Sequence, residues 1–454
     1  MAYNTKSGDL IQSMLLHLLS SGGYTRIPGH KEQTEDKPIV TYEPDKVYIP
    51  AVDNKGLPLD GKLPVGSVVK AGTLLGTRKD FALPVYSSVS GTITAMVKKK
   101  SSVVGRPVDF FEIANDKKDE KTFLEPLKEG AGKEEVVAKL KEGGIVGLGG
   151  AGFPAYIKYS TKAKIDYIIV NCVECEPYLT TDYVSILSLD LSPFFKALKI
   201  LSSAVGAGKV LLVTKKEKTG ITARFEEELK KLNDPLYEIR TVKNVYPAGF
   251  ERSLVYFTIG KRYENLPSEA GVIVSNFATV YASGLLFTKG EVLSRKVIIV
   301  SGEVAKPANV LVPYGVLAKD LIAFCGGYTI DRGTLILGGP MCGQATLTDD
   351  LPLLLPNNGL TVLKPKNYFV DNCLHCGNCS SHCPMDLQPV EIKDAARRGD
   401  YERCFDLKAL ECVNCGVCSY VCPSHIDVAA EVVQSKIMIK FKVKRASAPS
   451  PKKN

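Results

Sequence analysis

The chain has 454 residues, of which 45% are hydrophobic and 24% are charged. These values are ordinary for a globular protein and exclude a disordered chain or a disulfide-stapled miniprotein, while the length suggests several domains. No apolar run approaches the roughly 20 residues of a membrane-spanning helix. Residues 10–19 are interrupted by polar side chains and do not form the apolar core of a signal peptide. We therefore expect a protein that stays in the cytoplasm.

The charge is distributed unevenly. The formal net charge is +9, and seven of the positive charges lie between residues 436 and 454, where no acidic residue occurs. The rest of the chain therefore carries a net charge of only +2. This balance, with a single aromatic residue in the tail, argues against a nucleic-acid-binding protein. The basic tail could contact anionic lipid or simply be solvated, and the sequence leaves both readings open.

The N-terminal third predicts a helix followed by short strands. Apolar residues between Leu10 and Leu19 recur on one helical face, and we assign residues 1–37 to an N-terminal helix and segment. Residues 38–115 read as short strands separated by Gly and Pro turns. Within them, residues 65–72 and 84–93 resemble the two half-repeats of the biotinyl/lipoyl barrel-sandwich fold. The lysine that such a carrier modifies is missing from its hairpin, so we expect a structural barrel.

Residues 130–290 predict an α/β domain. A helix is expected near residues 133–141. After it, strand-like runs at 167–170, 209–214 and 271–275 alternate with helix-like runs at 192–205, 219–232 and 250–260. Such alternation is typical of a parallel sheet covered by helices. Residues 291–345 then read as a small mixed α+β domain, and residues 351–355 as a loop or a short edge strand.

Two loops of this α/β domain suggest ligand binding. The glycine-rich segment 143–154 exposes backbone N–H groups of the kind that bind phosphate. Asn171, Glu174 and Glu176 follow a predicted strand, at the end of the sheet where such folds bind ligands. Their side chains could accept hydrogen bonds from ribose or ribityl hydroxyls. A simple glycine turn and a solvated acidic loop remain the alternatives for these segments taken alone.

The cysteines carry the strongest pattern. Nine of the 13 lie between residues 373 and 422, where C-x2-C-x2-C-x3-C-P occurs twice, 39 residues apart. In two-cluster ferredoxins the fourth cysteine of each run binds the other cluster. This predicts one [4Fe–4S] cluster on Cys373, Cys376, Cys379 and Cys422, and a second on Cys412, Cys415, Cys418 and Cys383. Structural zinc commonly uses two spaced ligand pairs, which fits this pattern less well. Residues 366–435 are therefore expected to form a ferredoxin-type domain, followed by the basic tail at 436–454.

Together these motifs resemble a known family. The segments Gly147–Pro154 with Lys158, Glu174–Tyr178, Gly338–Met341 and the doubled cysteine motif look like the RnfC family, a subunit of the Rnf-type ferredoxin:NAD oxidoreductase complex. The resemblance covers roughly residues 22–435. The two loops also resemble the flavoprotein subunit of respiratory complex I. The implied fold is a multidomain α/β protein with a barrel-sandwich domain, a Rossmann-like FMN/NADH domain, a β-grasp-like (SLBB-like) segment and a two-cluster ferredoxin module.

The resemblance also implies roles for individual residues. The glycine loop would line the FMN and nicotinamide pocket, Lys158 would meet a phosphate or a flavin oxygen, and the acidic loop would hold hydroxyls and the amide. The pocket residues implied are Gly147, Gly149, Gly150, Gly152, Phe153, Lys158, Asn171, Glu174, Glu176, Tyr246, Gly249, Glu251, Asn276 and Thr279. Phe250 departs from the acidic residue of the complex I pattern. The family's N-terminal motif is only partly present at residues 22–31, a segment that we expect to pack and not to react.

The implied function is electron exchange between NAD(H) and ferredoxin through FMN and two clusters, with no catalytic acid or base. Partner subunits at the membrane would translocate Na⁺ or H⁺, and ferredoxin or a ferredoxin-like subunit would exchange electrons with this chain. The protein would then be peripheral, on the cytoplasmic face of the cell membrane. Two alternatives are a cobalamin reductase of a bacterial microcompartment and a cluster-wiring docking subunit without a nucleotide site.

Overall fold

The computed structural model describes residues 23–365 and 369–446, with side chains described as far as residue 442. The predicted helix at residues 10–19 lies outside this part of the chain. The chain divides into two compact units. The α/β unit comprises residues 29–243 and 254–365. The cysteine-rich unit comprises residues 1–28, 244–253 and 366–454, and each unit is described by itself below.

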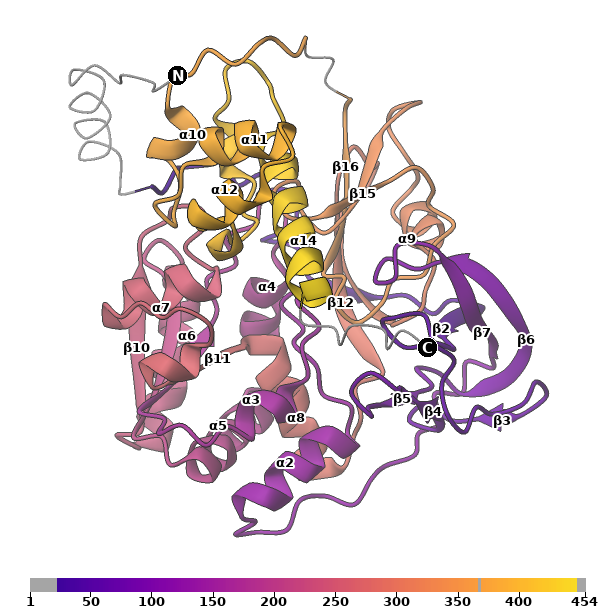
Figure 1. Ribbon diagram of the computed structural model, residues 1–454. Helices are drawn as coiled ribbons and strands as arrows, with labels where there is room; N and C mark the ends of the chain where they lie inside the picture. The colour runs from indigo at the N-terminus through magenta and orange to yellow at the C-terminus, as the bar shows by residue number, and fades with distance from the viewer. Residues whose placement is uncertain (1–22, 366–368, 447–454) are drawn as a thin grey trace, which may run out of the picture. The chain divides into compact units, whose positions relative to one another are not determined.

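The α/β unit contains a parallel four-stranded sheet, two of whose strands are labelled in Figure 1. Its strands are β8 (Tyr167–Asn171), β9 (Lys209–Lys215), β10 (Tyr237–Val242) and β11 (Val272–Asn276), and their order is β10-β9-β8-β11. The inner strands are almost wholly buried, as the continuous apolar sequences of β8 and β9 require. The three strands expected from the sequence are confirmed, whereas β10, which alternates apolar and polar residues at the edge, was not predicted.

Helices alternate with these strands along the chain. They are α2 (Lys133–Glu142), α3 (Ala155–Tyr159), α4 (Thr181–Ser188), α5 (Ser192–Val205), α6 (Thr219–Leu232), α7 (Glu251–Ile259), the 3-10 turn η1 (Pro267–Ala270) and α8 (Phe277–Lys289). Helices α5 and α6 have the predicted bounds. Helices α5 and α8 approach closely at Gly284, where an added Cβ would lie 2.0 Å from the carbonyl oxygen of Pro193. The apolar sequence of α8 gives no periodic signal, because the helix is buried on most sides.

The barrel-sandwich region contains two antiparallel sheets. One has the order β2-β7-β6-β3 and the other pairs β4 with β5. Their strands are β2 (Lys46–Pro50), β3 (Val68–Val69), β4 (Leu74–Thr77), β5 (Pro84–Tyr86), β6 (Gly91–Lys100) and β7 (Pro107–Asn115). Inward-facing residues of these strands, including Ile49, Leu75, Ile93 and Phe111, form a small core of their own. The short strands between turns that the sequence predicted are thus present.

A mixed six-stranded sheet completes the α/β unit, in the order β1-β13-β12-β16-β14-β15. Its elements are β1 (Ile39–Thr41), β12 (Arg295–Gly302), β13 (Ala308–Pro313), helix α9 (Ala318–Phe324), β14 (Thr334–Leu337), β15 (Gln344–Thr346) and β16 (Gly359–Leu363). Strand β1 pairs in parallel with β13 and so lies in this sheet. Residues 351–355 form a loop, with one isolated bridge from Pro352 to Leu317.

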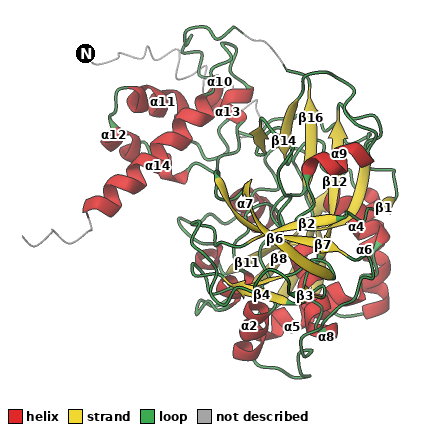
Figure 2. Ribbon diagram, turned by 90° about the vertical axis from the view of Figure 1, so that its right-hand side faces the viewer, coloured by secondary structure: helices red, strands yellow, loops and turns green. Residues whose placement is uncertain are grey.

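The described part of the cysteine-rich unit contains several short helices and one long helix, α14 (Figure 2). They are α10 (Asn378–Ser381), α11 (Pro389–Arg397), α12 (Tyr401–Asp406), the 3-10 turn η2 (Ala409–Glu411), α13 (Val417–Tyr420) and α14 (Val428–Ala446). Cys404 is fully buried in their core, which indicates a packing residue. Helix α14 continues through residues 436–446, which the sequence assigned to the tail.

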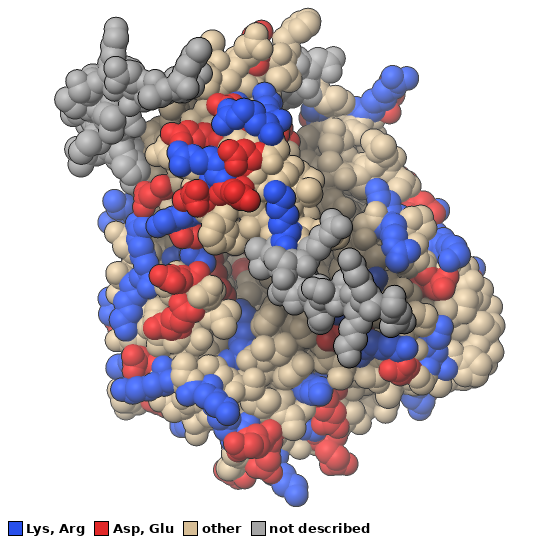
Figure 3. Space-filling view, viewed as in Figure 1, with Lys and Arg blue, Asp and Glu red and all other residues tan. Residues whose placement is uncertain are grey.

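The charged side chains follow the balance inferred from the sequence. In the space-filling view, Lys and Arg are interspersed with Asp and Glu over the visible face (Figure 3). Of the helices that the structure describes, none is both long and apolar enough to span a bilayer.

Candidate functional site

The strand order of the parallel sheet locates the first candidate site. Strands β8 and β11 are neighbours, and Asn171 and Asn276 lie opposite each other at their carboxyl ends. The chain winds outward from β8 through β9 to β10 and then returns to the other side of β8. In open α/β sheets, ligands bind at the carboxyl ends of the strands where the winding direction reverses.

The glycine loop closes on itself beside this point. The Gly147 N–H donates to the carbonyl of Phe153 at 2.8 Å, and the Gly152 N–H donates back to the carbonyl of Gly147 at 3.0 Å. Gly150, at the crest, has a φ of +111°, a backbone conformation that is strained for any residue with a side chain. The space around it is open, because an added Cβ would have no atom within 4 Å. The crest at Gly149 and Gly150 is exposed. The loop therefore offers backbone N–H groups on an open surface.

The base of the loop is held against the end of β11 and the start of α8. The Leu148 N–H donates to the hydroxyl of Thr279 at 2.9 Å, so this predicted ligand residue fixes the loop. A Cβ at Gly149 would lie 3.2 Å from the Cβ of Asn276, which is tighter than ordinary contact. Four of the predicted residues, Gly147, Gly149, Asn276 and Thr279, thus lie together.

The acidic loop reaches the same edge from β8. Glu174 has a φ of +33°, a conformation that is uncommon outside glycine. Its carboxylate accepts hydrogen bonds from the N–H groups of Asp182 at 3.1 Å and Tyr183 at 3.4 Å, at the start of α4. A helix N-terminus favours negative charge, so the start of α4 is a suitable partner for this carboxylate.

Lys31 is a residue of this site that the sequence interpretation missed. Its side chain is buried, and its amine donates to the carbonyl of Glu174 at 2.9 Å and to that of Leu179. The amine also lies 4.0 Å from the Glu174 carboxylate. Burial lowers the pKa of Lys31, and Glu174 opposes that shift. The signal was available, because Lys31 is the last residue of the segment 22–31, where the family's N-terminal motif is partly present.

Asp182 and Asn276 link the two loops. The Asn276 amide donates to the Asp182 carboxylate at 2.7 Å, and its own carbonyl caps α8 by accepting from the Ala278 N–H at 3.0 Å. Burial, together with the neighbouring Glu174, raises the pKa of Asp182 to about 8. Burial also lowers the pKa of Lys296 to about 7. A set of buried ionisable groups therefore surrounds the switch point.

Glu176 is held by a different part of the chain. Its carboxylate accepts from the N–H groups of Met341 at 2.7 Å and Cys342 at 3.1 Å. A Cβ at Gly339 would lie 2.4 Å from the Glu176 Cγ, so the Gly338-Gly-Pro-Met turn packs directly on this side chain. Burial raises the pKa of Glu176. These contacts give the carboxylate a role in joining the acidic loop to the mixed sheet.

Two further predicted residues have local partners. The Lys158 amine donates to the carbonyl of Val274 on β11 at 2.9 Å, and the Asn171 amide oxygen accepts from the Val173 N–H at 3.1 Å. Phe153, at the end of the glycine loop, is 39% exposed. Its ring meets that of Phe81 edge-on, with centroids 6.4 Å apart.

Tyr246, Gly249 and Glu251 belong to the cysteine-rich unit. The Tyr246 hydroxyl donates to the carbonyl of Cys415 at 2.8 Å, and its backbone pairs with Thr25 in both directions. The segment predicted at the flavin therefore braces the second cysteine run in this structure.

The two cysteine runs repeat one backbone conformation. The left-handed residues His375, Gly377 and Asp386 of the first run recur 39 residues later as Asn414, Gly416 and His425. The short helices α10 and α13 begin directly after the two glycines. The repeated sequence thus folds as two equivalent half-modules.

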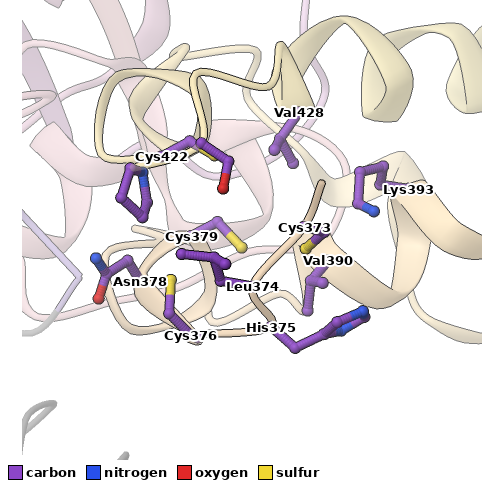
Figure 4. A pocket seen from close by; sticks show the side chains of 13 residues that line it. Cys373, Leu374, His375, Cys376, Asn378, Cys379, Val390, Lys393, Cys422 and Val428 are labelled. Carbon is purple, nitrogen blue, oxygen red and sulfur yellow. The ribbon is translucent and has the colours of Figure 1, made fainter. Parts of the chain in front are cut away.

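The first group of four thiols lines one hollow (Figure 4). The lining includes Cys373, Cys376 and Cys379 from the first run and Cys422 from the second, together with Lys393. Across the described part of the chain, no three His, Cys, Asp or Glu side chains converge closely enough to hold a single metal ion. The four thiols instead stand around a space between the two half-modules.

The second group lies close enough for its thiols to interact electrostatically. Cys383 from the first run raises the pKa of both Cys415 and Cys418, and Cys412 raises the pKa of all three thiols. Burial raises the pKa of Cys383 to about 11 and that of Cys415 to about 12. Metal binding would offset this shift, since a coordinated thiol is deprotonated. The structure therefore places the first set of four around one hollow and the thiols of the second set near one another, with Cys379 of the first set also close to Cys418.

Comparison with known families matches each part of this architecture. Residues 20–118 match the family described as the RnfC barrel sandwich hybrid domain, and residues 140–283 match the Nuo51 FMN-binding domain. Residues 297–345 match the SLBB domain, and residues 372–426 match the 4Fe-4S dicluster domain. The predicted fold class is confirmed: this is a multidomain α/β protein of the flavin and iron–sulfur electron-transfer class.

Curated relatives narrow the assignment. The chain is 30% identical over 399 residues to the C subunit of the Na⁺-translocating ferredoxin:NAD⁺ oxidoreductase complex of Acetobacterium woodii, covering 85% of this chain and 89% of that protein. It is 31% identical over 388 residues to the C subunit of the proton-translocating complex of Clostridium ljungdahlii, covering 82% and 83%. The C subunit of the ion-translocating oxidoreductase complex of Rhodobacter capsulatus is 31% identical over 391 residues, covering 82% and 74%. The chain therefore belongs to the RnfC family.

Proposed function

We propose that this protein is the NADH- and FMN-site subunit of an ion-translocating ferredoxin:NAD⁺ oxidoreductase complex. Its relatives are named as C subunits of Na⁺-translocating and proton-translocating ferredoxin:NAD⁺ oxidoreductase complexes. The observation that carries the proposal is the pairing of two four-cysteine groups with a glycine loop at the switch point of a parallel sheet. The cysteine groups could hold clusters that transfer single electrons, and the glycine loop could bind the phosphate of a nucleotide or flavin.

The glycine loop fits a flavin or dinucleotide. Its exposed N–H groups and the open space above Gly150 leave room for a phosphate or a ring. We assign Gly147, Gly149, Gly150, Gly152 and Phe153 to the pocket wall. FMN, when bound, would exchange a hydride with NAD(H) and single electrons with the clusters.

The residues around the loop hold it in place. Thr279 fixes Leu148, and Asn276 is oriented by Asp182, so neither side chain is free to swing. The Glu174 carboxylate, which lies 4.0 Å from the Lys31 amine, could accept hydrogen bonds from ligand hydroxyl groups at the edge of the sheet. Lys158, Asn171 and Glu176 support the same walls. We expect no residue to act as an essential acid or base.

We assign the clusters to the two cysteine groups. Cys373, Cys376, Cys379 and Cys422 would hold the first, and Cys412, Cys415, Cys418 and Cys383 the second. Tyr246 would act on the second group through the carbonyl of Cys415. Gly249 and Glu251 remain pocket residues that only the family resemblance implies.

The partners follow from the reaction. Two electrons and one proton convert NAD⁺ to NADH, so two reduced ferredoxin equivalents must deliver one electron each. Partner subunits at the membrane would couple this transfer to Na⁺ or H⁺ movement, with this chain docked on the cytoplasmic face. Lys440 and Lys442, exposed on α14, are the described part of the basic segment that could face anionic lipid.

One anaerobic preparation tests the proposal. Flavin, iron and acid-labile sulfide are quantified after reconstitution, and the visible spectrum is followed as NADH is added. The expected result is a flavin band that NADH bleaches, together with iron and sulfide for two clusters. Clusters without a flavin band would instead support the alternative of a docking subunit that lacks a nucleotide site.

A matched pair of variants ties the flavin to the glycine loop. Gly149→Ala places a methyl group 3.2 Å from Asn276, whereas Gly208→Ala, away from the loop, meets only a carbonyl oxygen at 3.9 Å. We expect at least a tenfold weaker FMN affinity for Gly149→Ala and no change for Gly208→Ala, measured by quenching of flavin fluorescence. Equal affinities would place the flavin elsewhere.

RnfC family membership favours this function over the cobalamin reductase alternative.

A further inference from the structure

Each cysteine group has a lysine packed against it. At the first group this is Lys393 on α11, whose side chain is only 1% exposed and lines the hollow of Cys373, Cys376, Cys379 and Cys422. Figure 4 shows Lys393 on the wall of the hollow near Val390 and Cys373. A lysine is rarely buried so completely unless a negative group compensates its charge.

The compensation visible in the protein is incomplete. The Lys393 amine pairs with the carboxylate of Asp394, which is 29% exposed and therefore partly hydrated. An ammonium group has three donors, and this carboxylate faces it from one side. The four thiolates of a bound cluster would supply negative charge on the side of the hollow.

The second group has its own cation. The Lys436 amine on α14 donates to the carbonyl of Cys412 and, at 3.1 Å, to the amide oxygen of Asn414. Both acceptors lie in the loop that carries Cys412 and Cys415. Lys436 therefore does not extend into solvent as part of the basic tail but is tied to the second cysteine run.

We propose that Lys393 and Lys436 tune the reduction potentials of the two clusters separately, Lys393 that of the first and Lys436 that of the second. A cluster with four thiolate ligands is negative, and it becomes more negative by one charge on reduction. A nearby cation stabilises the reduced form more than the oxidised form and so raises the potential. The inference rests on the cluster assignment of the proposed function and adds two residues that set the relative potentials of the clusters.

The surroundings of the two groups make separate tuning useful. Cys376 of the first group is exposed, whereas Cys383 and Cys415 of the second group are buried. Solvent stabilises the more charged reduced form, so burial alone would give the second cluster the lower potential. Lys436 would reduce this difference in potential because it raises the potential of the second cluster. Lys393 would maintain the difference because it raises that of the first.

The test is a redox titration of the intact reconstituted protein, followed by electron paramagnetic resonance. Lys393→Met removes the charge but keeps an unbranched side chain. It should shift the reduction equilibrium of the first cluster at least tenfold, or about 59 mV toward lower potential. Asp394→Asn breaks the same ion pair but should shift that cluster in the opposite direction. A structural role would move both variants the same way.

The second lysine supplies the reciprocal arm. Lys436→Met should lower the potential of the other cluster and leave the first unchanged. Lys440→Met, an exposed lysine one turn along α14, is the control and should shift neither. Cys376→Ser changes a ligand of the first group and identifies its signal.

The outcomes separate this inference from the proposed function. Iron and sulfide contents are measured on every sample before titration. Protein that binds no clusters would overturn the cluster assignment itself. Fully loaded variants whose potentials match the unmodified protein, or in which Lys393→Met and Asp394→Asn move together, would overturn the tuning role alone.

Discussion

Replacing Lys31 with Met tests the buried ionic contact at the switch point. The amine donates to the carbonyls of Glu174 and Leu179 and lies 4.0 Å from the Glu174 carboxylate. The two charged side chains are only 11% and 12% exposed. Methionine fills a similar volume, so the variant removes the charge and the donors with little change in packing.

The magnitude follows from what the variant leaves behind. A hydrogen bond from a charged donor contributes about 1.5–3 kcal/mol. Removing one partner of a buried ion pair costs about 3–5 kcal/mol, because the other charge remains without compensation. Glu174 still accepts two N–H bonds at the start of α4, which supports the lower end of that range. We therefore expect a loss of about 3 kcal/mol, a large share of the roughly 5–15 kcal/mol of a folded domain.

Urea unfolding followed by circular dichroism measures this loss in the apoprotein. Lys37→Met is the matched control, because Lys37 is a nearby exposed lysine that donates to a single carbonyl, that of Pro307, at 2.7 Å. Its loss should change stability by less than about 1 kcal/mol. If the two variants unfolded at the same urea concentration, the Lys31–Glu174 contact would not be a stabilising feature of the site.

Three further predictions concern single residues. Asp182→Asn should remove a pH dependence of stability. In the folded protein the Asp182 carboxyl keeps its proton up to a pKa of about 8, whereas in the unfolded chain it loses that proton near about 3.9. The contribution of Asp182 to stability therefore falls as the pH rises between those values, and the variant lacks this contribution. Urea midpoints measured from pH 5 to 8 check this, and parallel curves for the two proteins would contradict it. Tyr246→Phe should lower the stability of the cysteine-rich unit by about 1 kcal/mol, seen as an earlier thermal transition, because it deletes one hydrogen bond to the second cysteine run. Gly23→Ala should reduce iron incorporation at least twofold, since its Cβ would lie 2.3 Å from the Cys383 carbonyl oxygen, whereas Gly29→Ala meets only ordinary contacts and should load normally.

Local patterns predicted the elements whose signals are complete within a short segment. Helices α5 and α6 have the bounds that apolar periodicity indicates, and the buried strands of the parallel sheet lie where continuous apolar runs occur. The edge strand β10 and the buried helix α8 were not predicted. Their burial pattern depends on neighbours that come from elsewhere in the chain.

The same distinction holds for the functional residues. The spacing of the cysteines predicts the two groups of four, because the coordination chemistry of a cluster restricts the loop that carries three ligands. The glycine loop is equally local, since closure between Gly147 and Phe153 needs only the backbone freedom of the residues between them. The sequence by itself therefore determined the class of chemistry, the family and the fold class.

Only the tertiary structure decided which charges meet. Lys31 lies 143 residues from Glu174, and Glu176 binds a turn 165 residues further along the chain. Nothing in the local sequence marks Lys393, and Lys436 was assigned to the basic tail, yet one lines the first hollow and the other is tied to the second cysteine run. The energy of a buried charge depends on the groups that surround it in space, and those groups are assembled only when distant segments pack together.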